Sequence, residues 1–258
     1  MSGPLPLSLC VITRDAGSQL GACLASVPFA SEIVVVDSGS GDDTVEIARR
    51  SGARVIAQTW LGYGAQKNFA VAAAGNDWVL CLDADERLTP KLADSIRAVM
   101  ESVKPEGPAA YTFARRNRFL GRWLAHGEGY PDWNLRLFDR RRARWTEDPV
   151  HEHVVADGRV ERLAGDLKHE SAESLDSYLA KQNRYTSLQA EAMFARGERA
   201  SAIRLVMSPL VRFFRFYVVK LGFLDGIPGL VHIVIGCHNS FIKYAKLRAL
   251  KSGTDSRC

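Results

Sequence analysis

The chain lacks the sequence signals of several common protein classes. It has five cysteines in 258 residues and no Cys-x-x-Cys pair, which argues against a disulfide framework and against a zinc site built on thiolates. Cys10 and Cys81 stand inside apolar runs, so we expect both to be small core residues in a reducing compartment. No basic segment followed by an apolar core stands near the start of the sequence. We therefore expect no secretory signal and a cytoplasmic protein.

Signatures of nucleotide and nucleic-acid binding are also missing. No G-x-G-x-x-G follows the first apolar run and no G-x-x-x-x-G-K-[ST] occurs in the sequence, so the dinucleotide fingerprint and the P-loop are excluded. The net charge is a modest +5, and the arginine-rich runs at 115–122 and 140–144 carry no recognition motif for nucleic acid. We expect no nucleic-acid partner. The two runs are interpreted either as solvated surface or as contacts to a phosphate-rich ligand or an anionic membrane.

Alternating short elements are the main pattern that is present. Strands are predicted at residues 7–12, 33–36, 54–57, 78–82, 109–114 and 135–138, and helices at 64–74, 90–102 and from about 172 onward. Strands that alternate with helices predict a parallel sheet with right-handed crossovers. The predicted fold class is therefore α/β, a Rossmann-like and mostly parallel sheet with helices on both faces. We place it at residues 1–170, followed by a helical region at 171–258.

The helical region has an unusual composition. Residues 203–221 are dense in large apolar side chains, yet Arg204, Arg212 and Arg215 fall within roughly a quarter of the helix circumference. The next apolar run, 227–237, is too short to span a bilayer. Two interpretations stay open: buried core helices, or a basic and aromatic face that lies in a membrane interface.

Acidic side chains follow three of the predicted strands. Asp15 and Asp37 follow the first two, and Asp83 and Asp85 follow the strand at 78–82. Because ligands bind beyond the carboxyl ends of parallel strands, these groups would meet at one edge, where carboxylates can bridge a divalent cation to substrate phosphates. The alternative is a solvated acidic turn before the helix that begins at Thr89-Pro90.

Four motifs follow one another at residues 9–15, 33–44, 66–68 and 82–86, and three later segments occupy 133–138, 150–153 and 214–229. Their order resembles family 2 glycosyltransferases of the GT-A fold, most closely the branch of lipopolysaccharide core β-1,4-glucosyltransferases. A departure stands at Arg14-Asp15, where this branch more often has Asn-Glu.

The resemblance implies an enzyme that moves a hexose, with inversion, from a nucleotide sugar to an acceptor. Glucose from UDP-glucose and an inner-core heptose of lipopolysaccharide are the implied substrates, with a Mg²⁺ or Mn²⁺ ion held by Asp85 and His153. The acceptor would be a lipid-linked glycan, and the enzyme would be peripheral on the inner face of the cytoplasmic membrane. The residues implied to contact the nucleotide sugar are Thr13, Asp15, Asp37, Ser38, Gly39, Gln66, Lys67, Asn68, Asp83, Ala84 and Arg136. A polyprenyl phosphate or peptide acceptor, or a non-catalytic nucleotide- or membrane-binding module, are the alternatives.

The general base is assigned to the His-Glu-His motif. Glu152 is the first candidate, and Asp148 and Glu147 compete with it. In a regular strand the histidines at 151 and 153 would share one face and Glu152 would point to the other. Glu152 as base together with His153 as metal ligand therefore requires irregular backbone.

Overall fold

The computed structural model describes residues 3–104, 106–148, 152–170 and 174–255, with side chains as far as 251. The chain divides into two compact units. The first contains residues 1–115 and 133–170, and the second contains 116–132 and 171–258. This differs from the sequence-based boundary in one segment, because residues 116–132 leave the first unit and join the helical one.

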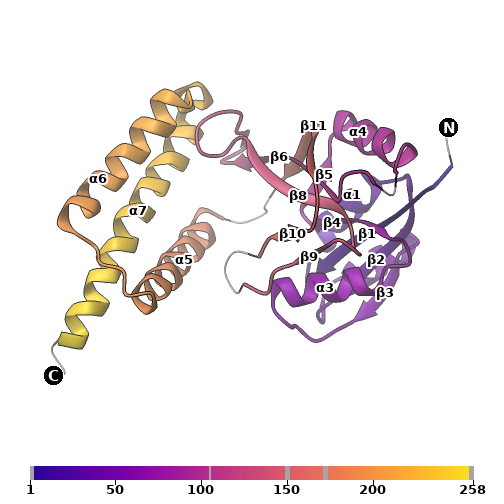
Figure 1. The fold of residues 1–258 in the computed structure, drawn as a ribbon, viewed down its shortest axis with the longest axis horizontal. Helices are drawn as coiled ribbons and strands as arrows, with labels where there is room; N and C mark the ends of the chain where they lie inside the picture. Colours follow the sequence, from indigo (N-terminus) through magenta and orange to yellow (C-terminus); the bar gives the residue numbers. More distant parts are fainter. Residues whose placement is uncertain (1–2, 105, 149–151, 171–173, 256–258) are drawn as a thin grey trace. The chain divides into compact units, whose positions relative to one another are not determined.

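A mixed sheet forms the centre of the first unit (Figure 1). Its four parallel strands lie in the order β3, β2, β1, β4, and β8 continues the sheet antiparallel to β4. Beyond β8 follow β6, β11 and β5, and a separate two-stranded sheet pairs β9 with β10. The mostly parallel α/β fold predicted from the sequence is confirmed. The strands are β1 (Leu5–Thr13), β2 (Ala30–Asp37), β3 (Arg54–Ala57), β4 (Trp78–Asp83), β5 (Glu86–Leu88), β6 (Ala110–Phe119), β8 (Asp132–Asp139), β9 (Ala143–Trp145), β10 (Val154–Ala156) and β11 (Val160–His169).

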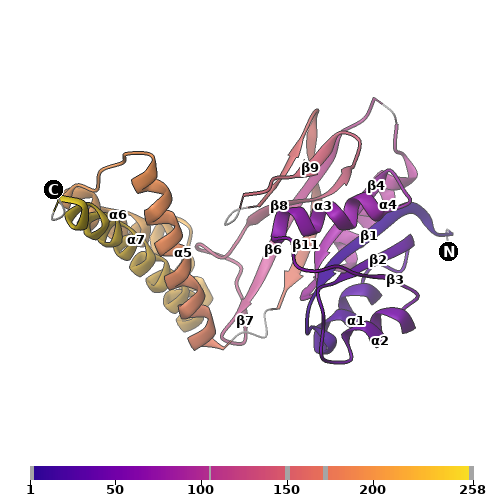
Figure 2. The same cartoon turned by 90° about the horizontal axis from the view of Figure 1, so that it is seen from below.

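Helices cover both faces of this sheet because the strands are apolar on both faces. The side chains of Leu9 and Val11 point into one core with α1 (Gly17–Ala25), α2 (Thr44–Arg50) and α4 (Pro90–Glu101). Cys10 and Cys81 point into the other core, against α3 (Tyr63–Ala73). Figure 2 shows α1 and α2 on the opposite side of the sheet from α3. The alternation follows from the period of two along a strand, and both cysteines are core residues as predicted.

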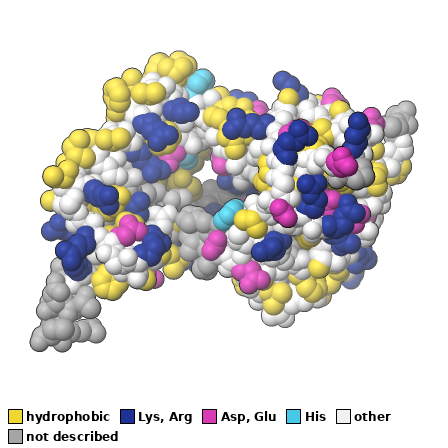
Figure 3. All heavy atoms as spheres, in the orientation of Figure 1, with side chains coloured by type: hydrophobic (Ala, Val, Ile, Leu, Met, Phe, Trp, Pro, Cys, Tyr) yellow, Lys and Arg dark blue, Asp and Glu magenta, His cyan; other side chains and the backbone are white. Residues whose placement is uncertain are grey.

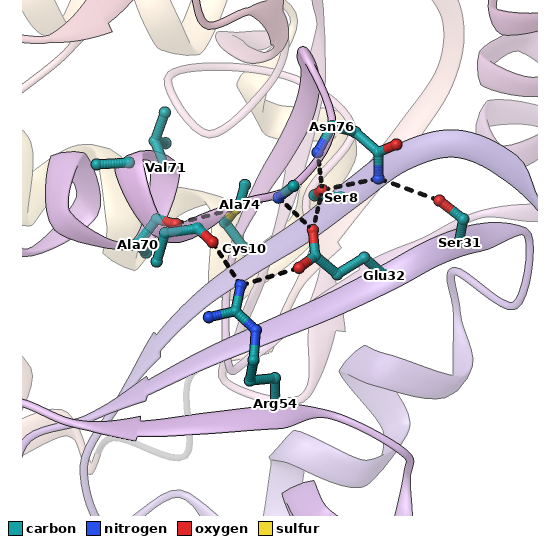
Figure 4. A network of polar contacts seen from close by, with 12 residues as sticks. Ser8, Cys10, Ser31, Glu32, Arg54, Ala70, Val71, Ala74 and Asn76 are labelled. Atoms are coloured by element: carbon teal, nitrogen blue, oxygen red, sulfur yellow. Dashed lines mark hydrogen bonds and ion pairs between the residues drawn. The ribbon is translucent and has the colours of Figure 1, made fainter.

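A polar network ties together the amino-terminal halves of the parallel strands (Figure 4). The Glu32 carboxylate accepts hydrogen bonds from the Ser8 hydroxyl, from Arg54 Nη2 at 2.9 Å and from the Gly75 backbone N–H at 2.6 Å. The Asn76 amide donates to Ser8 Oγ at 3.0 Å. Burial acts to raise the pKa of Glu32, but these donors and the charge of Arg54 outweigh it and hold the pKa below its usual range. This network therefore holds β1, β2 and β3 at the end of the sheet away from their carboxyl ends.

The second unit is helical. Its main helices are α5 (Leu175–Ala195), α6 (Ala202–Phe213) and α7 (Gly226–Asp255), with π-helical turns at Phe214–Val219 and a 3₁₀ turn at Gly222–Asp225 between the last two. Residues 116–132, with the short strand β7 (Arg122–Trp123), are fastened to it by the buried carboxylate of Asp225. Asp225 Oδ2 accepts from the backbone N–H groups of Ala125 at 2.9 Å and His126 at 2.8 Å.

No single helix in the described residues is long and apolar enough to cross a membrane. Two consecutive helical segments, Ala202–Val219 and Gly222–Lys251, reach that length and apolar composition only when they are taken together. They are bent by 75° relative to each other.

One of the three arginines predicted to form a basic face on α6, Arg212, makes its contacts inside the helical unit instead. Arg212 Nε lies 3.0 Å from Glu128 Oε2, and Arg212 Nη1 donates to Ser240 Oγ at 3.1 Å. Its guanidinium is therefore engaged within the helical unit. Arg204 and Arg215, in contrast, are exposed.

Candidate active site

The predicted site residues at the strand ends meet at one edge of the sheet. Thr13 pairs with Asp37 in the β1–β2 register, and Ile12 pairs with Asp83 in the β1–β4 register. The last residues of three neighbouring parallel strands therefore lie side by side. Cofactors and nucleotides bind at such an edge in open α/β sheets.

Asp37 organises the loop that follows β2. Its Oδ2 accepts from the N–H groups of Gly39 at 2.9 Å and Ser40 at 3.0 Å, and Gly39 adopts a positive φ of 90°. Thr13 Oγ1 beside it is buried and has no hydrogen-bond partner among the described residues. The loop therefore leaves one buried hydroxyl available at the end of β1.

Asp15 belongs to the same loop arrangement. Its φ of 49° lies in the left-handed region, its Oδ1 accepts from the Gly41 N–H at 2.7 Å, and its own N–H donates to Ser40 Oγ at 2.9 Å. The described contacts of Asp15 thus hold residues 38–41 beside the end of β1.

The Gln66-Lys67-Asn68 motif joins the first turns of α3 to its neighbours. Gln66 is completely buried and donates from Nε2 to Ser38 Oγ at 3.0 Å. Asn68 exchanges two hydrogen bonds of 3.0 Å with the backbone of Trp145 in β9. The structure therefore gives Gln66 and Asn68 protein partners, although the sequence predicted them as donors to the nucleotide.

Lys67, between those two residues, is buried and contacts two partly buried carboxylates. Its Nζ is 3.2 Å from Asp83 Oδ1 and 3.1 Å from Glu152 Oε1, and it stands over the Trp145 ring at 4.4 Å from the centroid. Arg136 Nη2 lies 2.9 Å from Asp83 Oδ2. Burial acts to raise the pKa of Asp83, but the charges of Arg136 and Lys67 outweigh it and hold the pKa far below its usual range. Asp83 is therefore ionised.

Arg136, predicted to contact the nucleotide sugar, contacts two carboxylates in the structure. It is buried, and Nη2 also lies 3.2 Å from Oε1 of the fully buried Glu86. Burial acts to lower the pKa of Arg136, while Asp83 and Glu86 raise it above its ordinary value. Nη2 is thus engaged by Asp83 and Glu86, whereas Nε and Nη1 are buried and have no hydrogen-bond partner among the described residues. Glu86, which was not among the predicted site residues, holds the Asp-x-Asp turn (Asp83–Asp85) by accepting from the Asp83 N–H at 3.0 Å.

Asp85 meets an imidazole that the sequence analysis missed. Asp85 Oδ2 lies 3.1 Å from His169 Nε2, and both side chains are about a quarter exposed, at 25% and 23%. Ala84 lies in the turn before Asp85. His169 is the last residue of β11 and pairs with Glu86 across the ladder. A carboxylate oxygen and an imidazole nitrogen that converge while staying open to solvent can share a divalent cation, which takes its other ligands from phosphates.

His153, predicted as a metal ligand, lies beside Asp148. Its Nδ1 lies 3.9 Å from Asp148 Oδ2, and both side chains are about 60% exposed. Glu152 and His153 precede β10 on irregular backbone, as their joint assignment required. His151 lies outside the described residues, and Glu147 is exposed. Across the described ranges, no group of three or more His, Cys, Asp or Glu side chains is arranged to hold a metal by itself.

Comparisons with known proteins show the family to which the chain belongs. The chain is 31% identical over 254 residues to an uncharacterized glycosyltransferase of Rickettsia typhi, covering 95% of this chain and 87% of that protein. It is 30% identical over 250 residues to the lipopolysaccharide core biosynthesis glycosyltransferase LpsC of Rhizobium meliloti, covering 94% and 92%.

A solved structure shares the fold across nearly the whole chain. The mannosyltransferase PcManGT from Pyrobaculum calidifontis, in complex with GDP-Man and Mn²⁺, has a TM-score of 0.51 at 16% identity and covers 96% of this chain and 86% of its own. The family model of Glycosyl transferase family 2 matches residues 8–160, which include the strand ends, α3, the Asp-x-Asp turn and Glu152. The chain therefore belongs to Glycosyl transferase family 2 and is a glycosyltransferase.

Proposed function

We propose that the chain transfers glucose from UDP-glucose, with inversion at the anomeric carbon, to an inner-core heptose of lipopolysaccharide. The observation that carries the proposal is the carboxyl edge of the sheet, where Asp85 with His169 and Lys67 with Glu152 flank the Asp-x-Asp turn. The likeness to LpsC along most of both chains supports a lipopolysaccharide core acceptor. The donor sugar rests on the motifs that resemble the glucosyltransferase branch.

Asp85 and His169 fit a divalent metal at this edge. Their facing atoms are 3.1 Å apart and partly exposed, so one ion could bind both and leave positions for diphosphate oxygens. When bound, such a metal offsets the negative charge that builds on the departing nucleoside diphosphate. Asp83, ionised by its two cationic neighbours, would stand beside this pair as a fixed negative charge.

Glu152 is the proposed general base. Its carboxylate would take the proton from the acceptor hydroxyl as that oxygen attacks the anomeric carbon. The side chain is 19% exposed and held on one oxygen by Lys67 at 3.1 Å, so the other oxygen can face the acceptor. Asp148 is mostly exposed beside His153, which makes it the weaker candidate in this geometry.

The acceptor also sets the proposed location. Because a lipopolysaccharide core precursor is a lipid-linked glycan, the enzyme would work at the inner, anionic face of the cytoplasmic membrane.

Transfer assays test the reaction. Purified protein with Mn²⁺ would receive radiolabelled UDP-glucose and, in separate reactions, core glycan that ends in heptose, a polyprenyl phosphate, or peptide. We expect a product only with the core glycan, heavier by one hexose in mass measurement. Transfer to a polyprenyl phosphate alone would refute the acceptor. Binding of UDP-glucose without turnover on any acceptor, under conditions where a known family 2 enzyme is active, would refute the enzymatic role of this site.

Two substitutions test the base. Glu152→Gln should abolish transfer while it leaves UDP-glucose affinity within about threefold, because the amide keeps the shape but cannot take a proton. Asp148→Asn is the matched comparison and should keep most of the activity. The opposite ranking would assign the base to Asp148.

A further inference from the structure

The helix α6 presents its apolar side outward. Ile203 is 74% exposed, Leu210 58% and Phe214, just after the helix, 60%, and no residue of α6 is buried. We name this surface the α6 strip, which consists of Ile203, Val206, Met207, Leu210, Val211 and Phe214. At 100° per residue these side chains fall within about 140° of the helix circumference. Figure 3 shows hydrophobic side chains gathered along the outer edge of the helical unit, over α6.

The inward side of the same helix carries polar and apolar side chains together, since Leu205, Ser208 and Arg212 are half-buried there. Arg212 lies on the side of α6 opposite the α6 strip, where it pairs with Glu128 and Ser240 of its own unit. A surface helix of a water-soluble domain normally turns its apolar stripe inward and its charges outward. On α6 the apolar stripe faces outward instead, which indicates that this face meets an apolar medium.

The apolar surface continues beyond α6 onto the next turns. Val219 is 62% exposed and Ile227, near the start of α7, is 75% exposed, and Leu221, Phe223 and Leu224 between them are also exposed. The two helical parts are bent by 75° relative to each other, and only together are they long and apolar enough to cross a membrane. An extended apolar surface on helices of this kind suits a position in the membrane interface, parallel to the bilayer plane.

The charges around the α6 strip indicate a lipid surface as the partner. Exposed Arg204 and Arg215 fall at one border of the strip, within reach of headgroup phosphates. The helical unit as a whole has twice as many Lys and Arg as Asp and Glu residues, which suits the negative inner leaflet. A second copy docked strip to strip would instead set two equally basic units against each other.

We propose that the α6 strip inserts into the interfacial layer of a phospholipid bilayer, and that burial of its apolar side chains, more than attraction of arginines to anionic headgroups, supplies the binding. This rests on the membrane location in the proposed function but not on the donor, the acceptor or the chemistry. It reverses the expectation from the arginine spacing, because Arg212 is engaged inside the unit and only two arginines of that face remain at the border.

Vesicle sedimentation of the full chain tests the proposal. The vesicles would be phosphatidylcholine alone, and phosphatidylcholine with phosphatidylglycerol at three to one. We expect binding to both, stronger to the mixed vesicles, with less than a tenfold loss on going from low salt to high salt. The triple variant Ile203→Ser, Leu210→Ser, Phe214→Ser should bind about a hundredfold more weakly.

A matched control keeps the test specific. Leu175, Leu179 and Phe194 of α5 are exposed at 39%, 39% and 38% in the same unit, and their triple serine variant should bind vesicles like the wild type. Circular dichroism and thermal denaturation would show that both variants fold. Sugar transfer to a soluble core fragment should be unchanged in both, so failure of membrane binding and failure of the proposed reaction are told apart.

Three results would overturn the proposal. The first is binding only to the anionic vesicles, with complete release by salt, because charge would then supply the affinity. The second is unchanged binding by the α6 triple variant. The third is a wild-type dimer that ignores vesicles and that the α6 variant converts to a monomer, because the strip would then be an interface between copies.

Discussion

Lys67 Nζ lies 3.1 Å from Glu152 Oε1 and is only 6% exposed. The same ammonium lies 3.2 Å from Asp83 Oδ1. One buried cation therefore joins the proposed base to the Asp-x-Asp turn, and two carboxylates that would repel each other are held on either side of it.

Replacing Lys67 by methionine should lower kcat/KM for sugar transfer by roughly a hundredfold, because Glu152 would lose the contact that positions it. The free energy of unfolding should fall by about 2 kcal/mol, since two partly buried carboxylates would be left without their shared partner. Steady-state kinetics and denaturant unfolding measure both effects. Lys91→Met, at an exposed position of α4, is the control. Wild-type activity in Lys67→Met would exclude a role for this ion pair in catalysis.

Metal binding should depend on His169 and not on His153. His169→Gln and Asp85→Asn should each weaken Mn²⁺ binding in the presence of UDP by at least about tenfold, because each removes one of the two atoms that converge at 3.1 Å. His153→Gln should leave the affinity unchanged. Calorimetric titration of Mn²⁺ into the protein with saturating UDP measures all three. Loss of affinity in His153→Gln but not in His169→Gln would restore the sequence-based assignment.

Gly64→Ala should destabilise the protein by about 2–4 kcal/mol. A methyl group at this position of α3 would stand 1.9 Å from the Thr146 carbonyl oxygen, which is backbone and cannot rotate away. Gly21→Ala in α1 is the matched control, because its added carbon would meet only Ile47 at 3.5 Å. Denaturant midpoints of both variants test this. Equal midpoints would mean that residues 146–148 move aside without cost.

The Glu32 network should make stability depend on acid pH. The folded pKa of Glu32 lies below its ordinary value of about 4.5, so the carboxylate stabilises the fold fully above that pH and progressively less as pH falls through the folded pKa. Between pH 6 and pH 3 the wild type should therefore lose about 1 kcal/mol more than Glu32→Gln. Denaturant unfolding at a series of pH values gives this difference. Parallel pH curves for the two proteins would contradict it.

The sequence was sufficient for features that depend on local pattern. The apolar runs at 7–12 and 78–82 predicted β1 and β4. Because neighbouring strands were predicted to be parallel, Asp37 and Asp83 were expected at the same edge of the sheet, where the strands end. The partners of Asp83 and Asp85 could not be read in the same way. Arg136 and His169 come from β8 and β11, which enter the sheet by pairings distant in sequence, and no local periodicity shows where such strands insert.

The orientation of α6 illustrates the same limit. The spacing of Arg204, Arg212 and Arg215 gave their angular positions around a helix, and those positions are compatible with the structure. The spacing alone could not show which side of the helix faces the rest of the unit. That depends on Glu128, which lies in a loop more than eighty residues earlier and accepts from Arg212.

The hydrogen bonds that residues 116–132 make to Asp225 constrain the order in which parts of the chain can fold during synthesis. The chain passes between the two units after residue 115, after residue 132 and after residue 170. When residue 170 has emerged from the ribosome, the sheet unit has all of its strands, but Ala125 and His126 must wait for a carboxylate a hundred residues further on. The docking of residues 116–132 onto the helical unit is therefore a late step in folding, because it depends on contacts distant in sequence. It also follows that a chain cut after residue 170 would not end with a complete sheet unit alone, because it would keep residues 116–132 without the helices to which they bind.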